Sequence, residues 1–227
     1  MKRVITVLLA VLLVLSLAAC GSRVETKKLA GTWTCTIDVT DRMNAAAEQA
    51  LGLSAADGTA QMPLQLVLTV AEDGAYTLRY DSDAVRTALD AYAAALHPAA
   101  VESVYAAAEE QGLSREEYDA AMEKAGITMD DMVAAIFAGV DEEELLSLLT
   151  GRSAALTGYC RAEGGQLYLA DTAAELAETA DCLSYTLSDG TMTWTDAQGE
   201  LSSQLTEQEQ ELLRVPLTWT KRAEESK

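Results

Sequence analysis

The chain has 227 residues, of which 49% are hydrophobic and 23% charged, and its formal net charge at pH 7 is −20. A surface with this excess of carboxylates repels polyanions and anionic headgroups, so we expect no nucleic-acid partner. The chain holds one histidine, His97, and no Cys-x-x-Cys pair, which disfavours a zinc site, and nothing in the sequence indicates a metal or a cofactor.

Residues 1–19 have the pattern of an export signal. Met1-Lys2-Arg3 is basic, and the uncharged run that follows is shorter than the roughly 20 apolar residues needed to span a bilayer. The segment ends in Leu17-Ala18-Ala19-Cys20-Gly21, which resembles the lipobox of bacterial lipoproteins. This resemblance implies cleavage before Cys20, acylation of that cysteine, and anchoring at the extracytoplasmic face of the cell membrane.

Residues 20–28 are small, polar and charged, and we expect them to form a lipidated leash. Two acyl chains hold a protein on a membrane stably, whereas one chain binds only marginally. Removing Lys2 and Arg3 with the signal leaves 14 basic against 36 acidic residues, a net charge of about −22. The remaining residues suffice for one domain, or for one domain with a large insertion.

Residues 29–81 predict three strands and a short helix. Alternation places Trp33, Cys35, Ile37 and Val39 on one face of the first strand, with threonines between them. An alanine-rich stretch from Asp41 to Leu53 predicts a helix that ends near Gly52. Two further strands form a hairpin about Glu72-Asp73-Gly74, because Asp-Gly between alternating runs is a strong hairpin signal. Their inner faces hold Leu64, Leu66, Leu68 and Val70, and Tyr76, Leu78 and Tyr80.

Residues 82–150 have helical patterns and predict an inserted helical subdomain. We expect one helix to end before His97-Pro98, because a proline disfavours helical geometry in the residue that precedes it. A second helix should follow from about Ala99 to Gln111. Ser114 and Glu117 have the spacing of a capping box for a third helix, and Thr128 and the acids at 141–144 should open two more.

Residues 151–222 return to the strand pattern, with a short tail at 223–227. Hairpins are expected about Glu163-Gly164-Gly165 and about Ser188-Asp189-Gly190, with a helical turn between them at 172–179. In the second hairpin, one face can hold Leu183, Tyr185, Leu187, Met192 and Trp194. The last strand, at 212–221, contains Pro216, which is typical of an edge or a bulge.

These elements predict a mainly β fold with a helical insertion between the third and fourth strands. Eight antiparallel strands joined by tight turns can form a closed barrel or a curved meander, and a closed barrel of this size holds its own side chains or one small ligand.

Gly31-Thr32-Trp33 at the head of the first strand, followed by a meander of hairpins, resembles the lipocalin-like group. The whole pattern is similar to that of lipocalin-like bacterial lipoproteins of Gram-positive cell surfaces. The matching stretches cover about half of the mature chain: LAGTWTCTIDVTD, LVLTVAEDGAYTLRY, GGQLYLAD, LSDGTMTWTD and VPLTWTKR. The resemblance implies that Trp33 plugs one end of the barrel. The helical insertion and the lack of a later Thr-Asp-Tyr motif depart from ordinary lipocalins, so ligand transport does not follow from the fold.

Candidate ligand contacts are aromatic residues of the strands: Trp33, Tyr76, Tyr80, Tyr185 and Trp194. Tyrosine suits a pocket because it combines an apolar body with a polar tip. The same residues, with Met192 and Trp219, can instead simply fill the core. Cys35, Cys160 and Cys182 allow one disulfide and one free thiol, and the sequence leaves the pairing open.

The sequence contains no motif that supplies a nucleophile and an orienting acid to His97, so we expect a protein without enzymatic activity. The favoured hypothesis is that the barrel binds a small apolar or amphipathic ligand. The alternative is a protein-interaction or scaffold module of the cell envelope that acts through the acidic helical insertion. Its apolar residues at helical spacing can either pack internally or form a groove for a partner.

Overall fold

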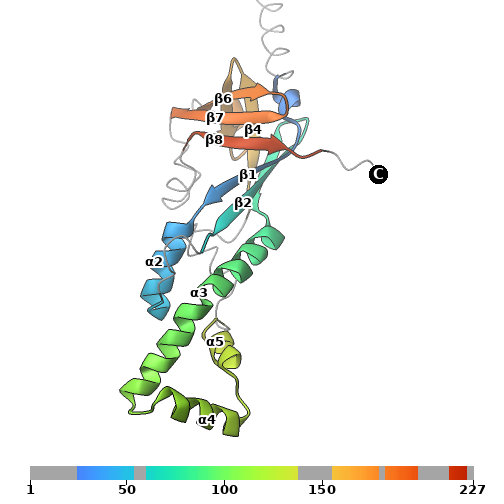
Figure 1. Ribbon diagram of the computed structural model, residues 1–227. Helices are drawn as coiled ribbons and strands as arrows, with labels where there is room; N and C mark the ends of the chain where they lie inside the picture. The colour runs from blue at the N-terminus through green and yellow to red at the C-terminus, as the bar shows by residue number, and fades with distance from the viewer. Residues whose placement is uncertain (1–24, 54–59, 138–154, 179–181, 199–214, 224–227) are drawn as a thin grey trace, which may run out of the picture. The chain divides into compact units, whose positions relative to one another are not determined.

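Eight antiparallel strands close a barrel in sequence order in a computed structural model of the chain, which describes residues 25–53, 60–137, 155–178, 182–198 and 215–223 (Figure 1). The strands are β1 (Gly31–Asp38), β2 (Pro63–Val70), β3 (Ala75–Tyr80), β4 (Leu156–Glu163), β5 (Gln166–Ala170), β6 (Cys182–Ser188), β7 (Thr191–Gln198) and β8 (Leu217–Lys221). The last strand, β8, pairs with the first, β1, through Lys221 opposite Trp33 and Thr220 opposite Thr34. The predicted eight-stranded barrel is therefore confirmed, in its closed form.

The β2–β3 hairpin forms as the sequence predicts. Val70 pairs with Tyr76, and Gly74 turns the chain at a φ of 92°, in the region that favours glycine. A side chain at Gly74 would also collide with the backbone carbonyl of Cys160 on β4. This glycine therefore serves both the turn and the close approach of a third strand.

An extra residue in β7 sets which side chains of the β6–β7 hairpin face the interior. Pairing changes from Ser184 with Asp196 to Tyr185 with Trp194, which leaves Thr195 as a bulge. Trp194 thereby shares a face with Tyr185 and is buried. The predicted apolar face holds for Leu183, Met192 and Trp194, but Leu187, near the end of β6, is 36% exposed.

The two ends of the barrel differ in their connections. Because successive strands are antiparallel neighbours, the tight turns after β2, β4 and β6 all lie at one end. The connections after the other strands leave from the opposite end, and they comprise residues 39–62, 81–155, 171–181 and 199–216. One end is therefore built from short turns and the other from long segments.

The helices lie in those long connections. They are α2 (Thr40–Leu51), α3 (Ser82–Glu110), α4 (Arg115–Ala125), α5 (Met129–Phe137) and the 3-10 turn η1 (Glu175–Ala177). Gly52 ends α2 in the left-handed conformation, and Ser114 and Glu117 form the predicted capping box of α4. The insertion of helices between β3 and β4 is confirmed. The helix predicted after residue 141, and the proposed lipidation site Cys20, lie outside the described residues.

The prediction that a helix ends at His97-Pro98 is wrong. α3 continues through Pro98 to Glu110, as one helix in Figure 1. Pro98 is exposed and removes a single backbone donor, whereas the buried side of α3 runs on across it, from Leu96 to Ala100. Packing of this face outweighs the cost of the proline, so His97 lies in mid-helix and does not meet the negative end of a helix dipole.

The chain divides into two compact units. The first comprises residues 1–35, 66–80 and 154–227, and the second comprises residues 36–65 and 81–153, so β1 and β2 contribute to both. In the second unit, Leu53, Ala100 and Val133 form a buried cluster, and Met129, Ile136 and Phe137 of α5 pack against it. Tyr92 donates a hydrogen bond to the side chain of Asn44 at 2.7 Å, which joins α3 to α2.

Candidate functional site

The interior of the barrel is apolar. Inward positions alternate with polar outward positions along the strands, and among the described residues Thr26 is the one polar or charged residue that is buried. The buried side chains that line the interior include Trp33, Cys35, Leu66, Leu68, Val70, Tyr76, Cys160, Ala162, Leu167, Leu183, Met192, Trp194, Leu217 and Trp219. On β4 the inward positions hold small residues, Gly158, Cys160 and Ala162.

The turn end of the barrel is covered by residues 25–29, which form a short helix ahead of β1. The Thr26 hydroxyl accepts a hydrogen bond from the backbone N–H of Ala162 at 3.0 Å, and the Glu25 carboxylate accepts one from Gly164 at 2.8 Å. Leu29 is 1% exposed. These contacts hold residues 25–28, the last part of the segment expected as a leash, on the barrel.

Trp33, at the start of β1, lies at the covered end of the barrel. It is 1% exposed, and its indole Nε1 donates to the backbone carbonyl of Leu29 at 2.7 Å. The Lys221 ammonium lies 5.3 Å from the centre of the Trp33 ring. These contacts make Trp33 a structural part of the covered end.

Of the tyrosines predicted as ligand contacts, Tyr76 is buried, whereas Tyr80 and Tyr185 are half-buried. A Cβ atom at Gly158 would lie 2.9 Å from Cε1 of Tyr76 and 3.0 Å from its hydroxyl, so the ring of Tyr76 covers that glycine. Tyr185 is the cross-strand partner of Trp194. Burial, the charge of Glu25 and that of Cys160 raise the pKa of Tyr185. Tyr80 pairs with Leu66 at the far end of β3.

Trp194, a predicted ligand contact, forms a pair with Trp219, which the sequence indicated only as a core residue. Trp194 pairs with Leu217, and Trp219 pairs with Met192, so the two indoles are diagonal neighbours on β7 and β8. Their ring centroids are 4.8 Å apart, and Trp194 is 4% exposed and Trp219 0% exposed. Neither indole Nε1 has a hydrogen-bond partner within the part of the chain that the structure describes. The alternation of Leu217 and Trp219 places Trp219 inside, but only the pairing shows that the two indoles meet.

Cys35, Cys160 and Cys182, all of which lie in the part of the chain that the structure describes, form no disulfide. Burial and the nearby charge of Asp73 raise the pKa of Cys160 to about 12, and burial raises the pKa of Cys35 despite a backbone hydrogen bond with Thr218. Cys182 is partly exposed, and its sulfur donates to the Gln166 side chain at 3.3 Å. The disulfide left open by the sequence is not formed, and Cys35 and Cys160 act as small apolar side chains.

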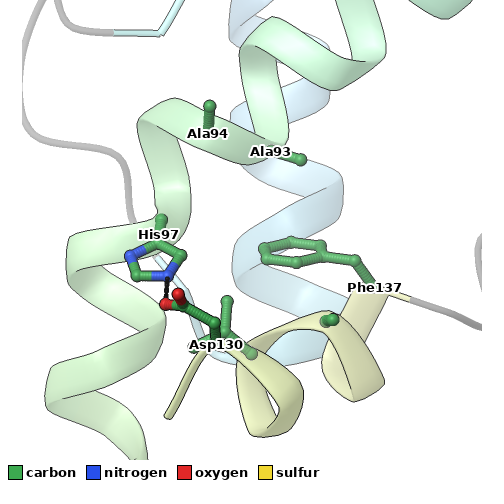
Figure 2. Close-up of a pocket in the computed structure, with 7 residues that line it drawn as sticks. Ala93, Ala94, His97, Asp130 and Phe137 are labelled. Carbon is green, nitrogen blue, oxygen red and sulfur yellow. Dashed lines mark hydrogen bonds and ion pairs between the residues drawn. The ribbon is translucent and has the colours of Figure 1, made fainter. Parts of the chain in front are cut away.

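A hollow of about 540 Å³ lies in the second unit between α3 and α5. Its walls are Ala93, Ala94 and His97 from α3, with Asp130, Val133, Ala134 and Phe137 from α5. The α5 residues have the i, i+3, i+4, i+7 spacing and the α3 residues have the last three positions of that spacing, so each set lies on one helix face. Figure 2 shows the His97 ring facing the Asp130 carboxylate, 3.1 Å away, and the Phe137 ring projecting from α5. The hollow is open and largely apolar, and the His97–Asp130 pair lies on its border.

The described residues contain neither a group of metal ligands nor a helix that could cross a membrane. Among the residues placed by the structure, no three histidine, cysteine or acidic side chains are grouped as metal ligands. In the same residues, no helix has both the length and the hydropathy needed to cross a bilayer.

Comparison of the chain with models of protein families, with curated proteins and with solved structures gave no match. The assignment of a function therefore depends on the chemistry of the barrel interior and of the helical hollow.

Proposed function

We propose that this chain is an exported, lipid-anchored, lipocalin-like protein that binds a small apolar or amphipathic molecule in its barrel and catalyses no reaction. Cys20 carries the anchor at the extracytoplasmic face of the cell membrane. The apolar interior supports this proposal, because ligand sites in proteins are mostly apolar with a few polar groups that orient the ligand.

The difference between the two ends of the barrel is the observation that carries the proposal. Residues 25–29 and Trp33 cover the turn end, so a ligand enters from the end with the long connections. On β4, Cys160 and Ala162 present small side chains to the interior. Mouths of β-barrels are frequent ligand sites.

Native mass spectrometry of the full chain, purified from its own host, tests the binding function. The expected result is an additional small mass that is released on activation of the ions. Ala162→Leu adds volume to the barrel interior and should reduce the occupancy of this ligand. Ala134→Leu makes the same change in the helical hollow and should leave the occupancy unchanged. A chain that carries no mass beyond its acyl groups contradicts barrel binding.

Metabolic labelling with palmitate tests the anchor. Label should enter the wild-type chain and be absent from Cys20→Ser, whereas Cys182→Ser should be labelled as strongly as wild type. Absence of label from the wild type would show that the chain is not a lipoprotein.

The helical hollow supports a second function, the binding of an envelope protein. Apolar walls with Asp130 at their border, and with Asp90 one turn before Ala93, suit a segment that presents an apolar side chain beside a basic group. A photo-crosslinker at the exposed position Ala94 should capture one discrete protein in intact cells, and a crosslinker at Glu116 of α4 should not. Equal capture from both positions contradicts docking at the hollow.

A further inference from the structure

The two unpartnered indoles of the barrel indicate which chemical group its ligand carries. Trp194 and Trp219 are almost completely buried, and each retains an indole N–H with no acceptor among the described residues. A buried donor without a partner is costly, and most buried polar groups in native proteins are therefore hydrogen-bonded. Two such donors on rings 4.8 Å apart point to an acceptor that binds on the interior side of β7 and β8, beside both indoles.

Trp33 provides an internal comparison. It is the remaining one of the chain's three tryptophans, and it is as deeply buried as the other two. Its indole N–H, however, is hydrogen-bonded to the backbone carbonyl of Leu29. The barrel therefore provides a hydrogen-bond acceptor for the indole N–H of Trp33, which has a structural role. Among the three tryptophans, each of which the structure describes, only the pair on β7 and β8 has indole N–H groups without a partner in the described residues.

The surroundings of the pair favour a neutral acceptor. An ionised carboxylate in an apolar interior requires a cation, and the buried residues that the structure records contain no charged side chain. Lys221, which neighbours the interior, is exposed and lies over the ring of Trp33. Cys35 and Cys160 are protonated at neutral pH, because burial raises the pKa of both thiols. A carbonyl or ether oxygen accepts hydrogen bonds from indole without bringing a charge into the barrel.

We propose that the Nε1–H groups of Trp194 and Trp219 form the polar subsite of the barrel and bind a neutral acceptor oxygen, such as an ester or amide carbonyl, of an otherwise apolar ligand. This inference rests on the proposed function of the barrel and adds the chemical class of its ligand. Two N–H donors select an acceptor over a hydrocarbon of the same shape, because the hydrocarbon would leave both donors unpaired.

This subsite can be observed directly by NMR. The experiment records the indole N–H signals in a proton–nitrogen spectrum of the 15N-labelled full-length chain. Three tryptophans give three indole signals, assigned through single Trp→Phe variants. Methyl octanoate and decane, which have equal numbers of chain atoms, are the probes. Methyl octanoate should move the Trp194 and Trp219 protons downfield, as expected for a new hydrogen bond, and should leave Trp33 in place. Decane should move neither proton downfield.

Affinity measurements on two variants separate the N–H groups from the rings. Trp194→Phe and Trp219→Phe keep an aromatic ring and remove the N–H donor. Each substitution should therefore lower the affinity for methyl octanoate about fivefold relative to the affinity for decane. Trp33→Phe removes a donor that is already bonded, and it should leave the ratio of the two affinities unchanged. Nonanoate should bind more weakly than the ester, because its charge has no buried partner.

The outcomes distinguish this inference from the function on which it rests. If both probes bind equally well and the two indole signals respond alike to them, the barrel binds ligands but the indole subsite is wrong. The same conclusion follows if each indole N–H contacts a bound water that methyl octanoate does not displace. If none of the probes binds, barrel binding of such ligands fails, and the inference fails with it.

Discussion

The indole of Trp33 and the backbone carbonyl of Leu29 are joined by a hydrogen bond of 2.7 Å that ties the first strand to residues 25–29. The covered end of the barrel is thus built from the segment that follows Cys20 most closely. Four residues lie between Cys20 and Glu25, and the five steps along an extended chain span at most about 17 Å. With the proposed anchor in place, the covered end stays near the membrane, and the end with the long connections is the more distant one.

Thr26→Val should destabilise the protein by about 1–3 kcal/mol. The substitution keeps the shape of the side chain but removes the hydroxyl that accepts from the buried N–H of Ala162, and that donor is left without a partner. Urea unfolding followed by circular dichroism measures the change. Lys27→Ala, which breaks an exposed ion pair with Glu72, should cost less than about 1 kcal/mol. A Thr26→Val midpoint equal to that of the wild type would show that residues 25–29 do not hold the barrel end.

Gly158→Ala should destabilise the barrel by about 1–3 kcal/mol through steric overlap. A Cβ at this position would lie 2.5 Å from the carbonyl oxygen of Ala170 and 2.9 Å from the ring of Tyr76, so strand β5 or the tyrosine must shift. Gly112→Ala is the control, because its Cβ would enter open space and its positive φ alone costs about 1 kcal/mol. Thermal unfolding of the two variants should rank Gly158→Ala as the less stable, and the reverse order contradicts the close approach of β4 and β5.

Native Cys160 should resist alkylation at pH 8, whereas Cys182 should react. A thiol with a pKa of about 12 is about one part in ten thousand thiolate at that pH, and Cys160 is also buried. Iodoacetamide labelling under reducing conditions, followed by peptide mass spectrometry, gives the rate at each cysteine. Unfolding in urea should make the rates similar, and similar rates in the native state are incompatible with burial of Cys160.

The pKa of Asp38 should rise when the side-chain hydroxyl of Thr40 is removed. The hydroxyl and the backbone N–H of Thr40 both donate to the Asp38 carboxylate, and these bonds hold its pKa below the usual 3.8. A lowered pKa means that this contribution to stability is complete above the unfolded-state value and is lost as the pH falls below it. Carbon-detected NMR titration of Thr40→Val should show the Asp38 midpoint moving toward 3.8, while the backbone bond retains part of the shift. An unchanged midpoint would falsify the role of the hydroxyl.

Local sequence signals determined several elements without help from the fold. Asp73-Gly74 defined a hairpin because few residues other than glycine adopt its positive φ, and Gly52 ended α2 for the same reason. Ser114 and Glu117 identified the start of α4, since both halves of a capping box lie within one turn. Alternation assigned the inward face of β1, because a strand that is buried on one side can hide only every second residue; on β2, Val67 is buried as well as its neighbours Leu66 and Leu68.

Tertiary structure decided what depends on residues far apart in the chain. The buried face of α3 carried the helix through Pro98, and contacts with Ala162 and Gly164 ordered residues that look like a polar leash. The pairing of β7 with β8 brought Trp194 beside Trp219 and left their donors without a partner among the described residues, which no single-strand pattern can show. The physical reason is that propensity and periodicity are properties of neighbouring residues, whereas burial and hydrogen-bond satisfaction belong to the packed chain.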